Sequence, residues 1–428
     1  MGRRDADNEA MNKALGIGFA TVFASFAFMG GTASASTTCS LFASPTGSDA
    51  ASGTAAAPLQ TAQKLVASLS PGQAGCLEAG NYTQDVTFSR AGRAGAPITL
   101  SSAPGQAATL TGRLWIRQGA DYVSVSNLNL VGVNADDLPS PTINAANATF
   151  SHDDVTNDHT AICFAVGSGW GRATNTLIAN NRVHDCGVLP AANLDHGIYV
   201  ADATNTMIRW NEIYNNADRG IQLYPDAQRT TIHHNVIANN GEDLLFSGDD
   251  GTASNGANVY DNVITGAVLR HDVESYYPAG NPVGTGNTLH NNCVWGGAKG
   301  AIDTSDGGFT SYRNITGDPY FVNAGTHDYH LGATSPCLTL TGDIAAAVDG
   351  RPATIALAST KPSSSTAARR RALARAANAR RHHSRAGGIR GRAARRYGSA
   401  AAPAAVLLAP LPPAATRSVA RSQALTSR

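Results

Sequence analysis

Three stretches of the chain read almost alike: NTLIANNRVHDC (175–186), NTMIRWNEIYNN (205–216) and RTTIHHNVIANN (229–240). Each has an apolar residue, an Asn three positions later, and a second apolar residue two positions beyond the Asn. The three sets are Ile178/Asn181/Val183, Ile208/Asn211/Ile213 and Ile232/Asn235/Ile237. The chain therefore contains an internal repeat, and the pattern within the repeat decides the fold class.

The same pattern continues in both directions along the chain. It recurs at Phe150/Asp153/Val155, Val125/Leu128/Leu130, Val259/Asn262/Ile264 and Leu289/Asn292/Val294, with a weaker copy at Asn314. The marker positions 128, 153, 181, 211, 235, 262 and 292 are separated by 25, 28, 30, 24, 27 and 30 residues. Each unit holds short β-rich runs bounded by Asn, Asp and Gly, without a helical stripe. This pattern predicts an all-β parallel solenoid of about 8 coils.

The recurring Asn has a physical role in such a solenoid. Successive coils stack about 4.8 Å apart, so one residue type at one coil position becomes a column of identical side chains. Asn side chains in a column hydrogen-bond amide to amide, and Asn also tolerates the left-handed backbone of a tight turn. The flanking Ile, Val and Leu are expected to fill the bore. Asn is also common in ordinary loops, but that alternative does not explain the matched triplets.

With these repeats, the chain resembles the right-handed parallel β-helix proteins of the pectate-lyase-like superfamily, many of which are secreted and act on polysaccharides. The resemblance covers roughly residues 40–340. It also rests on SPTGSDAASGTAAAPLQTAQKLV (44–66) and on the closing motifs DPYFVN (318–323), DYHL (328–331) and SPC (335–337). It implies a right-handed parallel β-helix. The Gly-His-Gly of polygalacturonases and the Arg motifs of pectate lyases are absent, so the resemblance implies the fold and no one reaction.

The ends of the chain differ from its centre. Residues 1–35 carry Arg3, Arg4 and Lys13 before an apolar run and a small Ala33-Ser34-Ala35 stretch, which is typical of a secretory signal peptide. Residues 36–96 are expected to form an N-terminal cap and the first strands, residues 97–340 the β-helix, and residues 341–428 a linker and disordered tail. Within the cap, residues 58–69 place an apolar stripe on one face of a helix that would cover the open end.

The tail is basic and the rest of the chain is acidic. Residues 361–428 contain 15 Lys and Arg and no Asp or Glu, so subtracting +15 from the net charge of +1 leaves −14 for residues 1–360. The tail is expected to contact an anionic cell-envelope polymer, with nucleic acid as another candidate anionic partner and a merely solvated tail as the alternative. We expect a secreted or cell-surface protein that is monomeric, has no transmembrane span once the signal is removed, and binds no nucleotide.

All six cysteines follow the signal peptide. An even number in an exported chain favours disulfides, and six cysteines allow about fifteen connectivities. We expect neighbours along the chain to pair: Cys39 with Cys76, Cys163 with Cys186, and Cys293 with Cys337. The chain has no CxxC and no HExxH, so the sequence gives no support for a zinc site.

Aligning the coils on one inward-facing position brings charged residues into columns. The inward position is predicted for Ile198, Ile221, Leu245, Val273 and Ile302. Three positions earlier lie Asp195, Asp218, Glu242, Arg270 and Lys299, and two positions earlier lie His196, Arg219, Asp243, His271 and Gly300. One position later, pointing outward, lie Tyr199, Gln222, Phe246, Glu274 and Asp303, followed by Tyr224 and Tyr276. This face is the candidate functional site.

Two kinds of polysaccharide chemistry fit these columns. In β-elimination, Arg219 would neutralise a substrate carboxylate, or a Ca²⁺ held by Asp195, Asp218 and Glu242 would do so, and His196 or Arg270 would take the α-proton. In hydrolysis, Asp218 would pair with Glu242 or Glu274 as acid and base. The expected substrate-binding residues are Tyr199, Gln222, Tyr224, His271, Tyr276 and Lys299.

Other interpretations of the same residues stay open at this point. Asp and Arg at turn entrances often form structural ion pairs, and the aromatic column would also fit packing under loops. A noncatalytic adhesion module, with the solenoid as a rigid stalk and the tail gripping the envelope, is the alternative to an enzyme. The sequence favours an acidic polysaccharide as the substrate and a lyase as the enzyme class, and Ca²⁺ is the single candidate cofactor.

Overall fold

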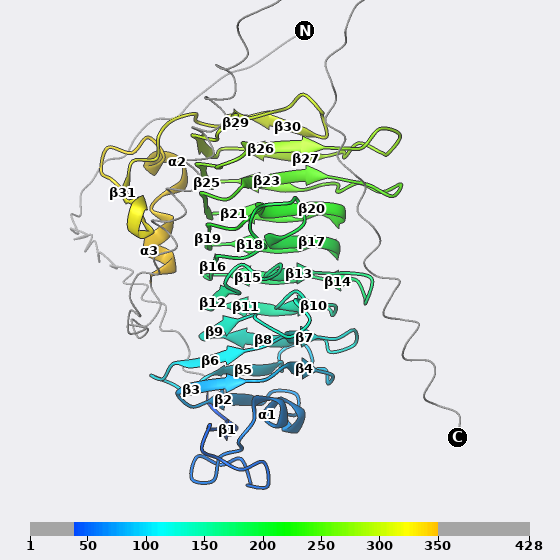
Figure 1. The fold of residues 1–428 in the computed structure, drawn as a ribbon, viewed down its shortest axis with the longest axis vertical. Helices are drawn as coiled ribbons and strands as arrows, with labels where there is room; N and C mark the ends of the chain where they lie inside the picture. The colour runs from blue at the N-terminus through cyan, green and yellow to red at the C-terminus, as the bar shows by residue number, and fades with distance from the viewer. Residues whose placement is uncertain (1–37, 350–428) are drawn as a thin grey trace, which may run out of the picture. The chain divides into compact units, whose positions relative to one another are not determined.

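The computed structural model describes residues 38–349. The expected signal peptide and the basic tail lie outside this range. Within it, the chain winds through three parallel sheets that stack coil upon coil (Figure 1). Within the described part of the chain, no helix has the length and apolar character needed to cross a bilayer.

Each sheet takes its strands from successive coils. Sheet 1 contains β1 (Leu41–Ala43), β2 (Ala74–Leu77), β5 (Ile98–Ser102), β8 (Val123–Ser126), β11 (Thr149–Ser151), β15 (Leu177–Ala179), β18 (Met207–Arg209), β21 (Thr231–His233), β24 (Asn258–Tyr260), β27 (Asn287–His290) and β30 (Phe309–Tyr312). Sheet 2 contains β3 (Gly80–Thr83), β6 (Ala108–Thr111), β9 (Leu128–Val131), β12 (Asp154–Thr156), β16 (Arg182–His184), β19 (Glu212–Tyr214), β22 (Val236–Ala238), β25 (Val263–Thr265) and β28 (Cys293–Trp295). Sheet 3 contains β4 (Val86–Phe88), β7 (Leu114–Ile116), β10 (Thr142–Ile143), β13 (Phe164–Val166), β14 (Ala173–Thr174), β17 (His196–Thr204), β20 (Arg219–Gln228), β23 (Glu242–Ser247), β26 (His271–Tyr276) and β29 (Gly300–Ile302).

The described coils confirm the all-β parallel solenoid. Sheet 2 has 9 strands, so the number of coils is close to the 8 expected. The first complete coil is β2, β3 and β4, so coils begin before residue 97, where the sequence placed the start of the β-helix. In sheet 1, Ile178 pairs in register with Ile208, and Ile208 pairs in register with Ile232. These side chains are fully buried in the bore, as the repeat predicted.

The Asn ladder occupies the short turn between sheets 1 and 2. The side-chain oxygen of Asn235 accepts hydrogen bonds from the backbone N–H (3.0 Å) and the amide Nδ2 (2.9 Å) of Asn211. Its own Nδ2 donates to the carbonyl of Ile208 at 2.9 Å and to Oδ1 of Asn262 at 2.9 Å. The same bonds recur along the ladder, and Asn314 is a true last rung. Each ladder amide therefore forms hydrogen bonds with backbone N–H and carbonyl groups in the turns of two coils.

The left-handed residue of this turn is not the ladder Asn. It is the residue immediately before it, as shown by Trp210 (φ 55°), His234 (φ 53°) and Asp261 (φ 54°). The ladder Asn is therefore required for its hydrogen bonds, and the expectation that it also supplies the left-handed backbone is wrong.

A second ladder, which the sequence analysis missed, lies in the turn between sheets 2 and 3. Asn216 donates from its N–H and Nδ2 to Oδ1 of Asn240 (3.0 and 2.8 Å), and Asn240 donates in the same way to Oδ1 of Asp243. Asp243 in turn shares a side-chain hydrogen bond with Asp272. Burial raises the pKa of Asp272 to about 7 and the pKa of Asp243 well above its ordinary value. The two carboxyl groups therefore share a proton.

The two ends of the solenoid are covered differently. Helix α1 (Ala62–Ser68) and its flanking residues bury the expected stripe of Leu59, Ala62, Leu65, Val66 and Leu69. It begins at Ala62 and not at Pro58, because Thr61 caps it and accepts a hydrogen bond from the N–H of Lys64. After the last coil, β31 (Phe321–Asn323), η1 (Ala324–Thr326), β32 (Asp328–Leu331), α2 (Leu338–Thr341) and α3 (Ile344–Val348) form a flap against sheet 2. Residues 318–340 thus lie outside the coils.

All three disulfides predicted from the sequence are confirmed. Cys39 is bonded to Cys76, Cys163 to Cys186 and Cys293 to Cys337. The first bond ties the N-terminal strand to the first coil, the second joins adjacent coils, and the third holds the flap to sheet 2.

Removing one central rung should destabilise the fold more than removing the last. In Asn235→Ala, buried partners on two coils lose their hydrogen bonds, so we expect the free energy of unfolding to fall by about 2–4 kcal/mol. Asn314→Ala, at a half-exposed rung that water can reach, should cost about 1 kcal/mol. Chemical denaturation of both variants measures this difference. Equal losses would show that the ladder does not stabilise the coils through buried hydrogen bonds.

The shared proton of Asp243 and Asp272 gives a pH-dependent stability. The folded state keeps a proton that unfolded Asp, with a pKa of 3.8, releases, so stability should fall as pH rises from about 4 through about 7. Asn at position 243 would present the same acceptor to Asn240 and donate to Asp272. Asp243→Asn should therefore gain ~1–2 kcal/mol over the wild type at pH 8 and little at pH 5. The exposed Asp306→Asn is the control, and a gain of the same size at both pH values would contradict the assignment.

Candidate functional site

The outer face of sheet 3 carries the predicted columns, with one correction of register. Ile221 pairs with Leu244, and Leu244 pairs with Val273, so Leu244 and not Leu245 holds the inward position. Leu245 therefore takes the outward position expected for Phe246, which is fully buried and stacks on Phe309 (4.7 Å between ring centroids). The alignment from sequence is wrong by one residue in β23 and right in β17, β20, β26 and β29.

This correction brings Glu242 beside Arg219. The two residues are register partners, and Nε of Arg219 donates to Oε2 of Glu242 at 2.9 Å. Both side chains are buried, with 8% and 1% of their surface exposed. Burial, together with the charge of the neighbouring Glu274, raises the pKa of Glu242 to about 7 against the opposing effect of Arg219. The buried carboxyl group therefore gains and loses a proton near neutral pH.

His196 lies on the strand before Arg219 and is its register partner. Burial, helped by the charge of Arg219, holds the pKa of His196 well below its ordinary value, and the neighbouring side chain of Gln222 opposes the shift. The imidazole is thus neutral at neutral pH. Nδ1 of His196, Oε1 of Gln222 and Oε1 of Glu242 are buried without a hydrogen-bond partner among the described residues. Three unpaired polar atoms on three neighbouring strands point to a place where a ligand binds.

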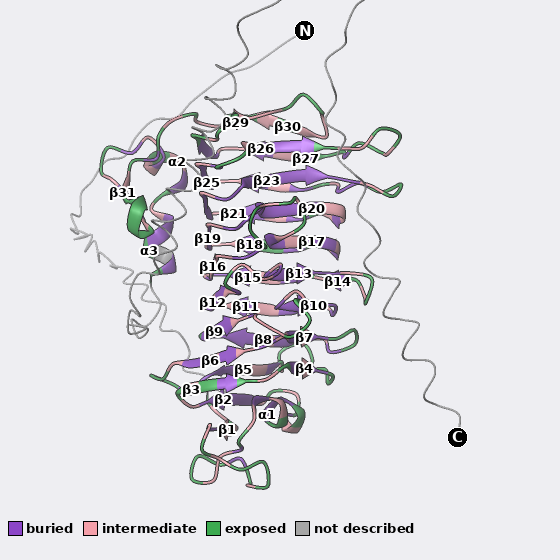
Figure 2. Ribbon diagram, viewed as in Figure 1, coloured by how far each residue is buried: buried purple, intermediate pink, exposed green. Residues whose placement is uncertain are grey.

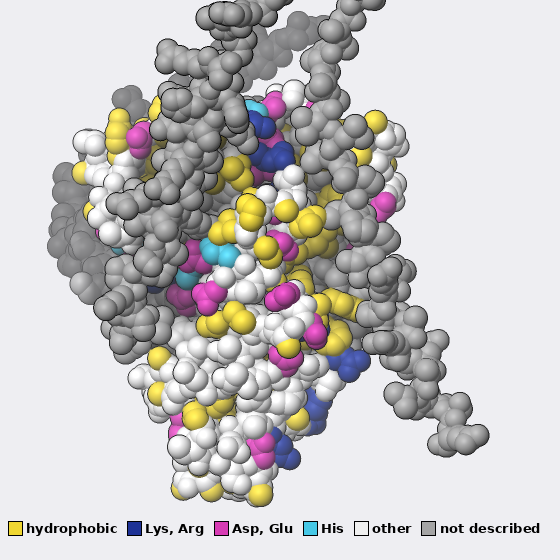
Figure 3. Space-filling view, in the orientation of Figure 1, with side chains coloured by type: hydrophobic (Ala, Val, Ile, Leu, Met, Phe, Trp, Pro, Cys, Tyr) yellow, Lys and Arg dark blue, Asp and Glu magenta, His cyan; other side chains and the backbone are white. Residues whose placement is uncertain are grey.

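A second group of charges continues the face onto β26 and β29. Nη1 of Arg270 donates to Oε1 of Glu274 at 3.1 Å, and Nδ1 of His271 lies 2.8 Å from Oε2 of the same Glu274. Asp303 lies 3.8 Å from His271, and Lys299 is exposed nearby. Figure 3 shows Lys, Arg and His side chains next to Asp and Glu near the top of the view, where Figure 1 labels β26 and β29.

The loop 187–195 closes over these charges. Asn193 accepts hydrogen bonds at Oδ1 from Nη2 of Arg270 (2.9 Å) and, more weakly, from Nη2 of Arg219 (3.5 Å). Its contact with Arg270 spans 77 residues of sequence, and no sequence signal pointed to it. Asp218 is the anchor of this loop, because its Oδ2 accepts the N–H groups of Leu194 (2.6 Å) and Asp195 (2.9 Å).

The column of carboxylates expected to hold Ca²⁺ is not formed. Asp195 and Asp218 are neighbours, and burial and the charge of Asp218 raise the pKa of Asp195. Glu242, however, lies one column away in its ion pair with Arg219. Over residues 38–349, no cluster of three or more His, Cys, Asp or Glu side chains is suited to hold a metal ion. Asp218 acts here through backbone hydrogen bonds to the loop.

The expected aromatic residues border the charged cluster. The rings of Tyr199 and Tyr224 are stacked with their centroids 6.3 Å apart, and His196 contacts Tyr199 edge-on at 5.5 Å. Tyr224 donates to Oδ2 of Asp249 at 3.1 Å, and Tyr276 is 38% exposed. Strands β23 and β26 beneath them are largely buried (Figure 2). Sheet 3 thus presents aromatic rings beside a buried cation and acid.

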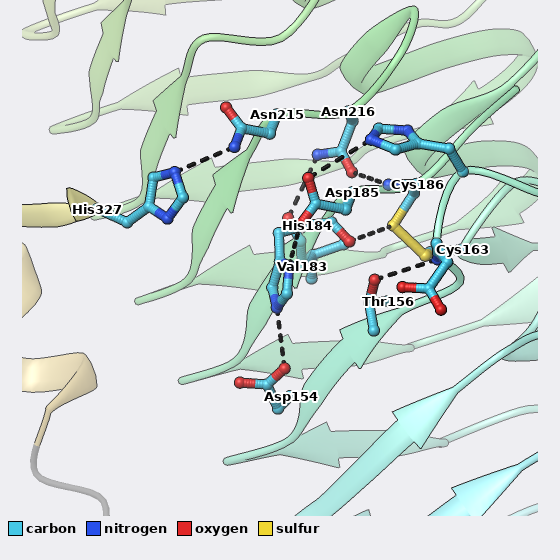
Figure 4. Close-up of polar contacts among 12 residues, drawn as sticks. Asp154, Thr156, Cys163, Val183, His184, Asp185, Cys186, Asn215, Asn216 and His327 are labelled. Atoms are coloured by element: carbon cyan, nitrogen blue, oxygen red, sulfur yellow. Dashed lines mark hydrogen bonds and ion pairs between the residues drawn. A yellow bond between two sulfur atoms is a disulfide. The ribbon is translucent and has the colours of Figure 1, made fainter. Parts of the chain in front are cut away.

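Two other features contain none of the predicted catalytic residues. An open cleft of about 480 Å³ lies between the loops 249–257 and 277–286 and is lined by Asp226, Gln228, Asn255 and Val283 among others. On sheet 2, both ring nitrogens of His184 contact carboxylates, Asp154 at 2.9 Å and Asp185 at 3.0 Å (Figure 4). These ion pairs raise the pKa of His184 to about 10. The imidazolium is therefore held in a structural pair beneath the flap.

Comparison with known proteins agrees with this geometry. The described residues have a parallel β-helix fold, and the family model that matches them is one of right-handed β-helices. Residues 118–316 match the family model described as a right handed beta helix region. No curated protein sequence matches the chain.

Solved structures share the fold at low sequence identity. A pectate lyase, Pel9A, is 15% identical with a TM-score of 0.54, and the match covers 69% of this chain and 90% of that one. A complex of XylC with xylose is 12% identical with a TM-score of 0.50, and covers 64% of this chain and 68% of that one. At these identities the likeness shows the fold alone.

The role of Asp218 as a loop anchor can be tested directly. In Asp218→Ala the N–H groups of Leu194 and Asp195 lose their shared acceptor, so their amide hydrogens should exchange about 10-fold faster or more. Hydrogen exchange followed by mass spectrometry measures this for the loop 187–195. Asp250→Ala, in the separate loop 249–257, is the matched control. Unchanged exchange in Asp218→Ala would show that Asp218 does not hold the loop.

Proposed function

We propose that this protein is a secreted carbohydrate-active enzyme that cleaves an acidic polysaccharide by β-elimination on the outer face of sheet 3. One observation carries the proposal: His196, Gln222 and Glu242 keep buried, unpaired polar atoms beside the buried guanidinium of Arg219. Buried polar groups without a partner destabilise the folded protein, and the coils can form without them. A bound sugar carboxylate and its hydroxyl groups would supply the missing partners.

Arg219 has the central electrostatic role in this mechanism. Its guanidinium would bind the carboxylate of a uronate unit and stabilise the negative charge that develops when the α-proton leaves. The low exposure of Arg219 strengthens this interaction, because little water competes for the charge. Glu242 holds Arg219 in place through Nε. Among the described residues, the two Nη atoms make only long hydrogen bonds to Asn193, at 3.4 and 3.5 Å, and the substrate would replace these when the loop 187–195 lifts.

His196 and Glu242 would move the protons. Neutral His196 takes the proton from the carbon next to the carboxylate, and the released electron pair forms a carbon–carbon double bond. The bond from the neighbouring carbon to the glycosidic oxygen then breaks, and protonated Glu242 supplies a proton to the leaving oxygen. Arg270 is the weaker candidate for the base, because Glu274 and Asn193 both accept hydrogen bonds from its guanidinium.

The fold relationships and the disulfides support the same proposal. A lyase of acidic polysaccharide, the pectate lyase, is among the structures with this fold. Three disulfides are typical of proteins made for an oxidising, extracellular compartment. The tyrosines beside the cluster would stack on sugar rings, with Gln222, His271 and Lys299 as hydrogen-bonding groups.

A noncatalytic binding module is the second candidate. The observation that favours it is the closed loop, because His196 is 3% exposed and Glu242 is fully buried beneath it. Catalysis requires the loop 187–195 to lift, whereas binding to Tyr276, which is 38% exposed, does not. A glycoside hydrolase would instead use Glu242 with Glu274.

The first test is turnover of a panel of uronate and neutral polysaccharides by the purified protein. Ultraviolet absorbance of unsaturated ends and release of reducing ends would be followed together. We expect unsaturated products, and His196→Ala or Arg219→Ala should lower their rate by about 100-fold or more. His290→Ala, on sheet 1, is the control. Reducing ends alone would indicate a hydrolase, and glycan binding without products would indicate the binding module.

The proton carried by Glu242 predicts the pH dependence of turnover. Because its pKa is about 7 and the protonated form is the active one, kcat should fall as pH rises through about 7. Glu242→Gln should lower kcat and abolish this descending limb. Glu212→Gln is a matched control, since Glu212 is also buried and ion-paired, with Arg182 on sheet 2. A descending limb that survives in Glu242→Gln would assign it to another group.

A further inference from the structure

A cluster of two tryptophans and two arginines lies near the N-terminal end of sheet 3. We call Arg113, Trp115, Arg117 and Trp170 the tryptophan–arginine cluster. The guanidinium carbon of Arg113 lies 4.6 Å from the ring centroid of Trp115 and 4.9 Å from that of Trp170, and Arg117 lies 5.3 Å from Trp115. The two indole centroids are 5.9 Å apart. Both rings therefore contact a cation.

The buried side chain of Asn144 holds this cluster in a fixed geometry. Trp115 donates from Nε1 to Oδ1 of the fully buried Asn144 at 2.8 Å. Nδ2 of Asn144 donates to Oγ of Ser168 (2.8 Å) and to the carbonyl of Gly171 (2.7 Å), which are the two ends of the tight turn that carries Trp170. Trp170 is nevertheless 41% exposed at the tip of this turn. A large aromatic ring is thus held rigidly and left open to solvent.

The two arginines lack carboxylate partners. Over residues 38–349, neither Arg113 nor Arg117 forms a salt bridge, and Nε of Arg113 is buried without a hydrogen-bond partner. Arg117 is exposed. Asp85 and Asp136 act on Arg113 only at longer range, and burial lowers its pKa. Two cations next to an exposed indole are therefore available to an anionic ligand with a flat apolar face.

The register of sheet 3 connects this cluster to the proposed active site. Trp115 pairs with Thr142, Thr142 with Ala165, and Ala165 with Tyr199. Trp115 thus occupies the outward column that continues through Tyr199 and Gln222 to Glu274. Three strand intervals separate Trp115 from Tyr199, which is roughly 14 Å along the solenoid. Both residues are therefore on one face and within reach of one polysaccharide chain.

We propose that the tryptophan–arginine cluster is a distal subsite that binds an acidic sugar unit of the polysaccharide held at Arg219. Trp170 stacks on the ring of the sugar, and Arg113 and Arg117 bind its carboxylate. This inference rests on the proposed function, because it assumes that the polysaccharide bound at Arg219 runs along sheet 3. It goes further in naming a second anionic contact, which makes a polymer with carboxylates on several units the preferred ligand.

The test measures binding separately from turnover. The full chain carrying His196→Ala is run in native gels containing polygalacturonate, alginate or neutral xylan, so that the polymer is not consumed. Trp170→Ala and Arg117→Gln are added singly to this background. Trp295→Ala is a matched control, because Trp295 is 43% exposed on sheet 2, and Arg313→Gln is the control for an exposed arginine. Thermal unfolding of each variant confirms that it is folded.

We expect one or both uronate polymers to retard the His196→Ala protein. Trp170→Ala and Arg117→Gln should each weaken this binding by about 3-fold to 30-fold, with the effect of Arg117→Gln shrinking at high salt. The two controls should bind like their background. Equal retardation of all variants, equal loss in the controls, stronger binding to xylan, or no retardation by any polymer would each overturn the subsite. Failure of the proposed catalysis would show separately, as absence of products from the wild type.

Discussion

The hydrogen bonds that close the turn between sheets 1 and 2 are the constraint on which the described structure depends. Each coil must return to within about 4.8 Å of the coil before it, and the tight turn leaves backbone groups that the sheets do not pair. A buried amide satisfies them, because Asn both donates and accepts and so links three coils through one side chain. With this turn fixed, the apolar residues on either side of it have to face the bore.

The turn between sheets 2 and 3 solves the same problem with less regularity. Asn216 and Asn240 repeat the amide pattern, but the next rungs are the carboxyl groups of Asp243 and Asp272. Two acids can follow an amide column only when a proton lies between them, so this part of the solenoid responds to pH. It also leads directly into β23, the strand that brings Glu242 to the outer face of sheet 3.

The repeat predicted the fold because its signal lies in local spacing. One Asn and two apolar residues per coil identify the turn, the bore and the direction of the chain, and the disulfide between Cys163 and Cys186 on adjacent coils follows from the same order. The register of β23 could not be predicted in this way. Every residue from Glu242 to Ser247 is buried, and Leu244 and Leu245 are adjacent, so the alternation that marks the inward side chain is lost. The contact between Asn193 and Arg270 is beyond any spacing argument, because a loop makes it across several coils.

The charges on sheet 3 are not a requirement of the solenoid. On the earlier strands β10 and β13, Thr142 and Ala165 occupy the outward column that Tyr199, Gln222 and Glu274 occupy on later strands. The strands with these uncharged residues are paired in the same parallel register. A buried Arg219 and Glu242 pair stabilises a fold poorly, since the loss of hydration offsets most of its attraction. Unpaired polar atoms beside that pair make its cost larger still. Because uncharged residues suffice for the coil, the placement of a cation, an acid and a neutral imidazole on three adjacent strands is best explained by a ligand that completes their hydrogen bonds.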